Sequence, residues 1–320
     1  MTKEESEELK PIEDDNIVRS GKLDVGDGHE LYWVDWGNKS IENPIFYLHG
    51  GPGGGFDAKD FNKFDPNKNR VVFHDQRGSG RSTPFASTAN NTSQDLIADI
   101  TKLRGQLGFE KISLYGTSWG ATLSLLYAIE HAEVVEKMLI GGIYLARKTD
   151  NDFYLRGQVS SHFPEAWEKF IGLVPKSERD NIGGYYKNMM NSDDESERKR
   201  FAKNWMLYES SILKLDYVPS SVETNLKDFA SESIAYLEAH YILNNCFIEE
   251  NYILKNIDKL KEIKIVIVQG RYDFICMPSS AFELKNALGE NETLHMVMAG
   301  HSSSDTVQRE VIRAYVNMLW

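Results

Sequence analysis

The five residues 116–120, Gly-Thr-Ser-Trp-Gly, constrain the fold of this chain more than any other stretch. They follow a short apolar run at 111–115 and precede a helical pattern at 121–131. A serine on such a sharp strand-to-helix turn is held in a strained backbone and pushed out of the sheet, and small flanking residues are needed because sheet and helix crowd together there. The pattern predicts a nucleophile elbow with Ser118 as the nucleophile. The alternative is a tightly packed turn without chemistry.

A serine hydroxyl needs a base to take its proton and an acid to orient that base. In hydrolases built on such an elbow, the partners follow in the chain order serine, acid, histidine. Two strand-like runs, 263–269 and 293–298, end shortly before Asp273 and His301. The carboxyl edge of an open α/β sheet is where such proteins carry their sites. Asp273 and His301 are therefore predicted to complete a triad with Ser118.

Other acids and histidines fit this order and position less well. Asp258 is the rival acid, but it lies in a polar helical stretch, 256–261, and is expected to face solvent. Five other histidines lie in an N-terminal hairpin, after the elbow helix, inside a strand or in the helical middle of the chain: His29, His131, His295, His162 and His240.

A glycine-rich loop, His-Gly-Gly-Pro-Gly-Gly-Gly at 49–55, follows the predicted strand 45–48. Glycine lets the backbone approach a reacting carbonyl closely and direct an N–H group at it. Hydrolases with this elbow take the two oxyanion donors from such a loop and from the residue after the nucleophile, so Gly50 and Trp119 are the predicted donors. A flexible loop or a phosphate cradle is the alternative. A phosphate cradle would end in Gly-Lys-Ser/Thr or open a helix after a G-x-G-x-x-G pattern, and this loop does neither well.

The composition disfavours several classes of function. The 48 acidic and 36 basic residues give a formal charge of −12, which argues against nucleic acid or an anionic membrane as a partner. No stretch approaches the ~20 apolar residues of a membrane span. Residues 1–15 are acidic and polar, unlike a signal peptide, and are expected to begin as a disordered tail. Cys246 and Cys276 make no disulfide framework, so a cytoplasmic location is predicted. No metal and no cofactor is expected, and the oligomeric state stays open.

Strand and helix signals alternate through the first part of the chain. A hairpin at 17–37 is followed by strands at 45–48, 70–74, 112–115 and 136–140 and by helices at 93–107 and 121–131, the first opened by a capping box of Thr92 and Asp95. This alternation predicts a mostly parallel sheet with helices on both faces. From about 144 to 256 the sequence is helical and rich in Trp, Tyr and Met, and the alternation resumes at 263. We therefore divide the chain into a core, 1–143, an inserted helical cap, 144–256, and the rest of the core, 257–320. Such a cap would lie over the serine as a lid, exclude water and select substrate.

Four sequence blocks together resemble the proline iminopeptidases, a family of serine peptidases with the α/β-hydrolase fold. They are the glycine loop at 49–55, Asp-Gln-Arg-Gly-Ser-Gly-Arg-Ser at 75–82, the elbow at 116–120, and Val-Gln-Gly-Arg-Tyr-Asp-Phe-Ile-Cys at 268–276. The resemblance runs from the N-terminal hairpin to the final helix and covers nearly the whole chain. It implies an enzyme that releases an N-terminal residue, preferentially proline, from short peptides with a free N-terminus.

In that family two glutamates of the cap hold the free ammonium of the substrate, one in a W-x-x-W-E block and one in an E-x-H-Y block. Here the first block reads Trp-Met-Leu-Tyr-Glu at 205–209 and the second Glu-Ala-His-Tyr at 238–241. The resemblance therefore assigns amine binding to Glu209 and Glu238, and makes Trp205 and Tyr208 candidates for the pocket wall. Tyr208 stands where the family has the second tryptophan, a departure that concerns the pocket wall and the selectivity for proline rather than the reaction type. Two carboxylates in a closed pocket attract an ammonium strongly because the low dielectric amplifies the interaction, and the carbonyl of Gly51 is a candidate third acceptor.

Three further residues near these motifs have simpler interpretations. Asp75 and Arg77 follow a predicted strand near the glycine loop and are expected to form a buried ion pair that shapes it. Cys276, three residues after Asp273, is a candidate for the wall of the proline pocket. The alternative is that Cys276 is a small buried hydrophobic residue.

The predicted reaction is acyl transfer. His301 accepts the proton of Ser118, Asp273 holds His301 in the right tautomer, and Ser118 attacks the carbonyl of the N-terminal residue. An esterase, lactonase or amidase acting on a small non-peptide substrate is the first alternative, although a neutral ester has no use for a buried carboxylate pair. A non-catalytic binding protein is the second, but such a protein would be expected to lack a member of the triad.

Overall fold

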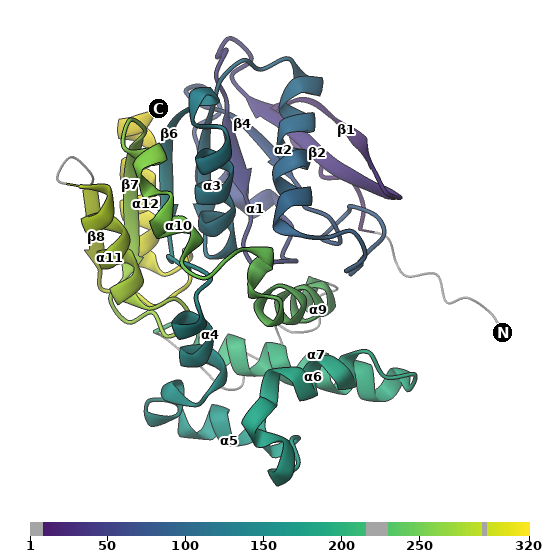
Figure 1. Cartoon of the computed structure of the whole chain (residues 1–320). Helices are drawn as coiled ribbons and strands as arrows, with labels where there is room; N and C mark the ends of the chain where they lie inside the picture. The colour runs from purple at the N-terminus through teal and green to yellow at the C-terminus, as the bar shows by residue number, and fades with distance from the viewer. Residues whose placement is uncertain (1–8, 216–229, 290–292) are drawn as a thin grey trace.

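The computed structural model describes residues 9–215, 230–289 and 293–320, with side chains from Glu232 onward after the first gap. Within these ranges a single mixed sheet of eight strands forms the centre of the molecule (Figure 1). The strand order is β1-β2-β4-β3-β5-β6-β7-β8. The bounds are β1 Ile17–Gly26, β2 His29–Gly37, β3 Ile45–Leu48, β4 Arg70–His74, β5 Ile112–Thr117, β6 Val135–Gly141, β7 Lys264–Gly270 and β8 Thr293–Val297.

The pairing of the strands confirms a mostly parallel sheet. β1 pairs with β2 and β2 with β4 in antiparallel fashion, so the predicted N-terminal hairpin forms one edge. The pairs from β4 through β3, β5, β6 and β7 to β8 are parallel. The central strands β3 and β4 are almost continuously buried, as expected for strands covered on both faces. Their carboxyl ends therefore meet at one edge of the sheet.

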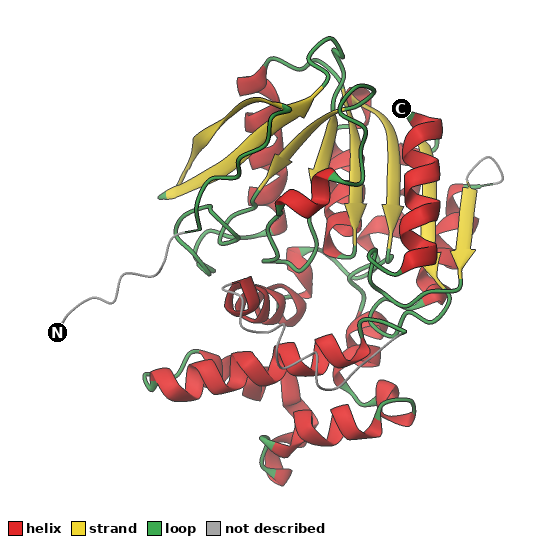
Figure 2. Ribbon diagram, turned by 180° about the vertical axis from the view of Figure 1, so that it is seen from behind, coloured by secondary structure: helices red, strands yellow, loops and turns green. Residues whose placement is uncertain are grey.

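Helices cover both faces of this sheet (Figures 1 and 2). One face packs against α2 Ser93–Leu107, α3 Trp119–Glu130 and α11 Pro278–Leu288 in one hydrophobic cluster, which includes Leu96, Leu123 and Leu284. The other face packs against α1 Ala58–Phe61 and α12 Thr306–Leu319, with Phe61 and Ile312 in a second cluster. Helix α2 begins with the predicted capping box, in which the Thr92 hydroxyl and the Asp95 carboxylate each accept a backbone N–H of the other residue.

The segment 144–256 between β6 and β7, which we call the cap segment, is mostly helical in its described residues. The helices described there are α4 Lys148–Leu155, α5 Pro164–Gly172, α6 Ile182–Met190, α7 Glu195–Ile212, α9 Ala230–Leu243 and α10 Tyr252–Lys255, and short 3₁₀ turns follow α4, α5 and α9. Helices α4 to α9 share a third hydrophobic cluster, which includes Phe170 and Trp205. Figure 2 shows these helices beyond the arrowheads of the parallel strands, at the carboxyl edge of the sheet. The three-part division of the chain stays a prediction.

Two other expectations concern the N-terminal tail and membrane-spanning segments. Most of the predicted N-terminal tail, residues 1–8, lies outside the described residues. None of the helices in the described ranges combines the length and the apolar character needed to cross a bilayer.

Candidate functional site

The predicted strand–turn–helix around Ser118 is present at the carboxyl end of β5. Ser118 has φ 58° and ψ −130°, a strained conformation for a residue with a side chain, and it directly precedes helix α3. A Cβ atom on Gly116 would lie 2.2 Å from the carbonyl oxygen of Gly120. A Cβ atom on Gly120 would lie 2.0 Å from the carbonyl oxygen of Leu48. The two glycines are therefore required by close approach of backbone, which is the physical reason for their places in the motif.

Asp273 and His301 are joined by a hydrogen bond of 2.8 Å between the Asp273 Oδ2 and His301 Nδ1 atoms. The carboxylate is itself held by three donors: the Gln269 side chain at 3.0 Å and the backbone N–H groups of Ile275 and Cys276 at 2.9 and 2.7 Å. Burial opposes a charge on His301, but the adjacent Asp273 carboxylate outweighs it and raises the pKa of His301 well above its ordinary value. The pair is thus oriented as an acid–base relay requires.

Ser118 and His301 meet at Gly142, which follows β6. A Cβ atom on Gly142 would lie 3.1 Å from His301 Cε1 and 3.3 Å from the Ser118 backbone nitrogen. Within the described residues no hydrogen bond joins the Ser118 hydroxyl to His301; such contacts often tighten only when substrate is bound. The structure therefore brings the three predicted triad residues to one place, at the ends of β5, β7 and β8.

The glycine loop approaches the elbow from the neighbouring strand β3. A Cβ atom on Gly50 would lie 3.3 Å from Ser118 Cβ. His49 fixes this part of the loop: Gln76 N–H donates to His49 Nε2 at 3.0 Å, so the other nitrogen, Nδ1, carries the proton and donates to the Gly50 carbonyl at 2.8 Å. Burial lowers the pKa of His49 to about 4, so it remains neutral.

The second predicted donor is the backbone N–H of Trp119, the first residue of α3. The first four N–H groups of a helix have no acceptor within the helix, and the positive end of the helix dipole favours negative charge beside them. The Trp119 indole donates to Gln76 Oε1 at 3.0 Å, which ties this residue to the same network that holds His49. Gly50 and Trp119 thus flank Ser118 from two elements.

Glu209 of α7 and Glu238 of α9 lie together in the cavity that also contains Ser118 and Gly51. Trp205 donates its indole N–H to Glu238 Oε2 at 2.6 Å, and the Tyr154 hydroxyl lies 3.5 Å from Glu209 Oε2. Glu238 is 6% exposed. Its burial, followed by the neighbouring Glu209 carboxyl, raises the pKa of Glu238 well above its ordinary value. Two carboxyls this close disfavour a negative charge on both at once.

The cavity is small, about 40 Å³, and is lined by residues from both the core and the cap segment. Cys276 lines it as expected, and burial raises the pKa of its thiol to about 11. Tyr208 is not among the residues that line this cavity; it donates to the Tyr154 carbonyl at 3.0 Å and stacks on Phe170 at 4.3 Å. Trp205 also lies behind the wall and acts on the cavity through Glu238. Helix α7 turns both aromatic rings into the third hydrophobic cluster.

The expected ion pair between Asp75 and Arg77 is wrong. Asp75 pairs with Arg81 at 3.2 Å and accepts the Phe56 N–H at 2.8 Å, whereas Arg77 forms a two-bond pair with Asp99 of α2 at 2.7 and 2.8 Å. The two side chains have different partners: Asp75 pairs within its own turn, whereas Arg77 pairs with a helix 22 residues further along the chain. Asp75 still shapes the glycine loop, because its carboxylate holds the backbone where that loop ends.

Sequence reasoning missed much of the cavity lining. The missed residues come mainly from α4, α9 and the turns beside them: Pro52, Tyr144, Asp150, Asn151, Tyr154, Tyr241, Ile242, Cys246 and Ile275. The spacing of 150, 151 and 154 is helical, but nothing in the sequence says which face of α4 turns to the serine. The Asp150 carboxylate also reaches the cavity, and Arg147 at 3.1 Å balances its charge. In the part of the chain that the structure describes, no group of three or more His, Cys, Asp or Glu residues is arranged to hold a metal ion.

Comparisons with known proteins agree with this geometry. Residues 43–306 match the family model of the alpha/beta hydrolase fold. A proline iminopeptidase of Neisseria gonorrhoeae is 40% identical over 288 residues, 89% of this chain and 91% of its own. A proline iminopeptidase of Arabidopsis thaliana is 39% identical over 89% of this chain and 76% of its own. A probable proline iminopeptidase of Leptolyngbya boryana is 38% identical over 89% of this chain and 88% of its own.

Solved structures agree at the level of the fold. An esterase of Exiguobacterium antarcticum superposes with a TM-score of 0.64 at 18% identity, covering 94% of this chain and 99% of its own. A proline iminopeptidase of Mycobacterium smegmatis superposes with a TM-score of 0.61 at 16% identity, covering 94% of this chain and 98% of its own. At such identities the likeness concerns the fold alone, so the chemistry is argued from the residues.

Proposed function

Because the chain belongs to the proline iminopeptidase family within the α/β-hydrolase fold, we propose that it is a serine aminopeptidase. It releases the N-terminal residue, preferentially proline, from short peptides. The single observation that carries this proposal is the buried pair Glu209 and Glu238 in the same cavity as Ser118. A hydrolase of neutral esters would gain nothing from two carboxyls there, whereas a peptide with a free N-terminus brings the cation that they require.

The catalytic sequence follows from the proposed roles of the triad. The substrate ammonium binds Glu209 and Glu238, with the Gly51 carbonyl as a third acceptor, and this sets its carbonyl carbon beside Ser118. His301 takes the Ser118 proton as the hydroxyl attacks, and Asp273 stabilises the resulting imidazolium. His301 then protonates the departing amine, which leaves the N-terminal residue as an ester on Ser118. Water, activated by the same histidine, hydrolyses this ester.

Charge stabilisation comes from the backbone. The tetrahedral intermediate carries an oxyanion, and the N–H groups of Gly50 and Trp119 are the proposed donors to it. The hydrogen bond from His49 to the Gly50 carbonyl supports this role because it holds the peptide planes of the loop in a single orientation. Donors oriented in advance cost no reorganisation at the moment of reaction.

The proposal also explains why only the terminal residue is removed. An internal peptide bond has no ammonium to place between Glu209 and Glu238, so its binding would leave a buried charge unpaired. The cap segment contributes both glutamates and part of the wall of the cavity that contains the serine, which supports its role as a lid. We further propose a reducing compartment such as the cytoplasm, because both cysteines, Cys246 and Cys276, are buried free thiols in the cavity wall.

Initial rates on five substrates test the proposed function. Fluorogenic amides of proline, alanine and leucine with free amines are compared with N-acetylprolyl amide and with a small nitrophenyl ester. We expect the prolyl amide to be cleaved fastest and its acetylated form to be nearly inert, because acetylation removes the cation. A preference for the ester together with equal rates on free and acetylated prolyl amide would refute the aminopeptidase and favour a general esterase.

A further inference from the structure

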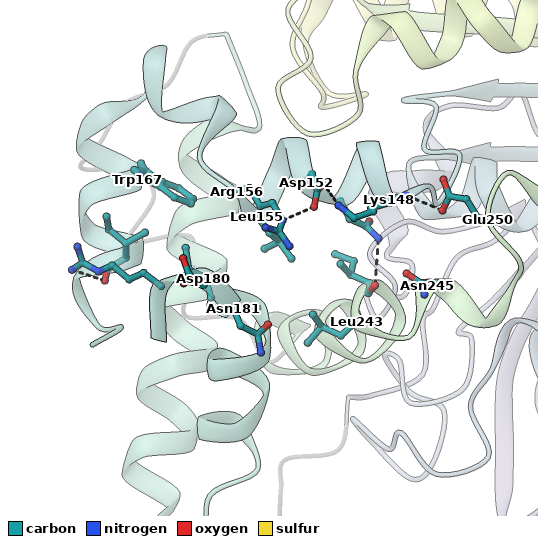
Figure 3. A pocket seen from close by; sticks show the side chains of 16 residues that line it. Lys148, Asp152, Leu155, Arg156, Trp167, Asp180, Asn181, Leu243, Asn245 and Glu250 are labelled. Atoms are coloured by element: carbon teal, nitrogen blue, oxygen red, sulfur yellow. Dashed lines mark hydrogen bonds and ion pairs between the residues drawn. The ribbon is translucent and has the colours of Figure 1, made fainter. Parts of the chain in front are cut away.

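A second and larger cavity lies directly behind the substrate cavity. It has a volume of about 660 Å³ and lies between α4 on one side and the start of α6 and the end of α9 on the other. Figure 3 shows Leu155 of α4 and Leu243 of α9 on opposite sides of it, with Trp167 farther out. Its volume is that of a ligand pocket, and its lining is mixed, with apolar side chains such as Leu155 and Leu243 beside charged ones such as Lys148 and Asp152.

The role of one end of the substrate cavity can be assigned by elimination. An N-terminal residue presents three groups: a carbonyl, an ammonium and a side chain. The carbonyl belongs at Ser118 and the ammonium at Glu209 and Glu238. The remaining lining, which includes Tyr144, Ile242 and the two cysteines, is therefore left for the side chain.

Two residues at that end, Asn151 and Ile242, line both cavities. The barrier between the cavities is thus one side chain thick. Asn151 braces it: the Tyr144 hydroxyl donates to Asn151 Oδ1, and Asn151 Nδ2 lies 3.4 Å from the Ile242 carbonyl oxygen. We propose that Ile242, braced by Asn151, sets the upper size limit of the N-terminal residue, and that removing this side chain opens the substrate cavity into the second one. This inference rests on the proposed function.

The backbone next to this barrier is held in place by its surroundings. The Ile242 side chain is therefore the part of the barrier that sets the size limit. Asn245, Cys246 and Phe247 all have positive φ, from 50° to 57°. Such a run persists only where its surroundings hold it. Here Ser93 donates to the Cys246 carbonyl at 2.5 Å and Gln94 to the Phe247 carbonyl at 3.0 Å. This backbone turn separates the cavities independently of side-chain size, because Asn245 lines the second cavity and Cys246 the first.

The chemistry of the space behind Ile242 defines what an opened pocket would accept. Leu155, Leu243 and Trp167 offer apolar surface there. Asp152 pairs with both Lys148 and Arg156, which offsets part of the positive charge beside this surface. A long apolar side chain, such as that of leucine or phenylalanine, would therefore gain contact, whereas the compact ring of proline would gain none.

The test compares Ile242→Ala and Ile242→Trp with Leu243→Ala, the adjacent residue on the same helix, which lines the second cavity but not the first. The readout is the ratio of kcat/KM for phenylalanyl or leucyl amide to kcat/KM for prolyl amide. A difference of one or a few methylene groups in a hydrophobic pocket changes such ratios about 10- to 200-fold. We expect Ile242→Ala to raise the ratio by that factor, Ile242→Trp to lower it, and Leu243→Ala to leave it within about twofold.

Inhibition by prolinol and phenylalaninol gives a second readout without turnover, because these amino alcohols carry the ammonium and the side chain but no scissile bond. An unchanged ratio of their inhibition constants in folded Ile242→Ala, or an equal change in Leu243→Ala, would overturn the inference. If Ile242→Ala does not fold, Ile242→Val and Ile242→Trp must shift the ratio in opposite directions. A wild-type enzyme without activity on prolyl amide would instead overturn the proposed function.

Discussion

Replacing Glu238 by glutamine should make the protein more stable and a worse peptidase. Glu238 is 6% exposed and contacts the Glu209 carboxyl, and Trp205 donates to it at 2.6 Å. Glutamine has the same shape and keeps an oxygen that can accept the Trp205 indole N–H. The substitution therefore removes the charge while preserving the packing and the hydrogen bond.

The sign of the stability change follows from the raised pKa of Glu238. Below the pKa of the unfolded chain, about 4.5, the carboxyl is protonated in both states and the substitution changes little. As the pH rises toward the higher folded pKa, unfolding releases a proton, so the wild type loses stability that the glutamine variant retains. Above the folded pKa, each unit by which that pKa is raised lowers the free energy of unfolding of the wild type by about 1.4 kcal/mol. A change of 1 kcal/mol shifts the Tm of a chain of 150–250 residues by about 2–4 °C.

The peptidase activity should change in the opposite direction. Removing one partner of a desolvated charge pair costs about 2–5 kcal/mol, which is roughly 30- to 5000-fold in kcat/KM for prolyl amide. Hydrolysis of a small nitrophenyl ester should change far less, because it needs only Ser118, His301 and the oxyanion donors.

The assay is thermal unfolding from pH 4 to pH 9 together with both activities. Glu262→Gln serves as the control because Glu262 is exposed, and it should leave Tm and both rates unchanged. We expect the Tm difference between Glu238→Gln and wild type to be near zero at pH 4 and to grow with pH. A lower Tm at pH 8, or a parallel loss of amide and ester hydrolysis, would refute the reasoning and make Glu238 a structural residue.

Three further predictions concern the triad and the cavity wall. Ser118→Ala should fold normally and lose a factor of about 10⁶ in kcat, and Asp273→Asn should lose a factor of about 10⁴. If Ser118→Ala retained more than a small percentage of activity in a clean preparation, Ser118 would be excluded as the nucleophile. The activity should rise with pH through the raised pKa of His301. The residual activity of Asp273→Asn should reach its plateau at lower pH, because the carboxylate that stabilises the imidazolium is gone. An acid limb of the pH profile that does not shift in this variant would count against the Asp273–His301 pair. A mercurial should inhibit wild type and Cys246→Ser but spare Cys276→Ser. Alkylation should be slow at pH 7 and accelerate with pH because burial raises the pKa of the Cys276 thiol to about 11. Equal sensitivity of wild type and Cys276→Ser, with resistance in Cys246→Ser, would assign the inhibition to Cys246, which lines the same cavity, and make Cys276 a packing residue.

The local parts of the fold could be predicted from the sequence because their causes are local. The elbow needs glycine at 116 and 120 for backbone contacts within a few residues and with one neighbouring strand. The capping box of α2 joins two residues three positions apart. Asp273 and His301 were identifiable because parallel strands bring their carboxyl ends to one edge, whatever the detailed packing.

The rest depends on contacts between remote segments. Arg77 pairs with Asp99 rather than Asp75 because α2 packs beside the turn, and no spacing reveals that. Tyr208 stands next to Glu209 in sequence, yet the rotation of α7 turns it into the cap core. The pairing of Glu209 with Glu238 was available only through the resemblance, since the residues alone would be interpreted as exposed helix carboxylates. Asn151 and Ile242 gave no signal because their importance lies in two cavities that exist only after folding.

The glutamate pair links the stability of this molecule to its selectivity. A buried carboxyl with a raised pKa is a cost of folding, and a sequence optimised for stability alone would replace it. In the proposed function, the cost is offset when a substrate ammonium enters the cavity and makes ionisation of both carboxyls favourable. The binding free energy gained in this way is available to peptides with a free N-terminus and to no internal segment. Selectivity for the end of a chain therefore lowers the stability of the free enzyme. The pH dependence of stability that Glu238 causes should disappear when a non-hydrolysable amine such as prolinol saturates the site.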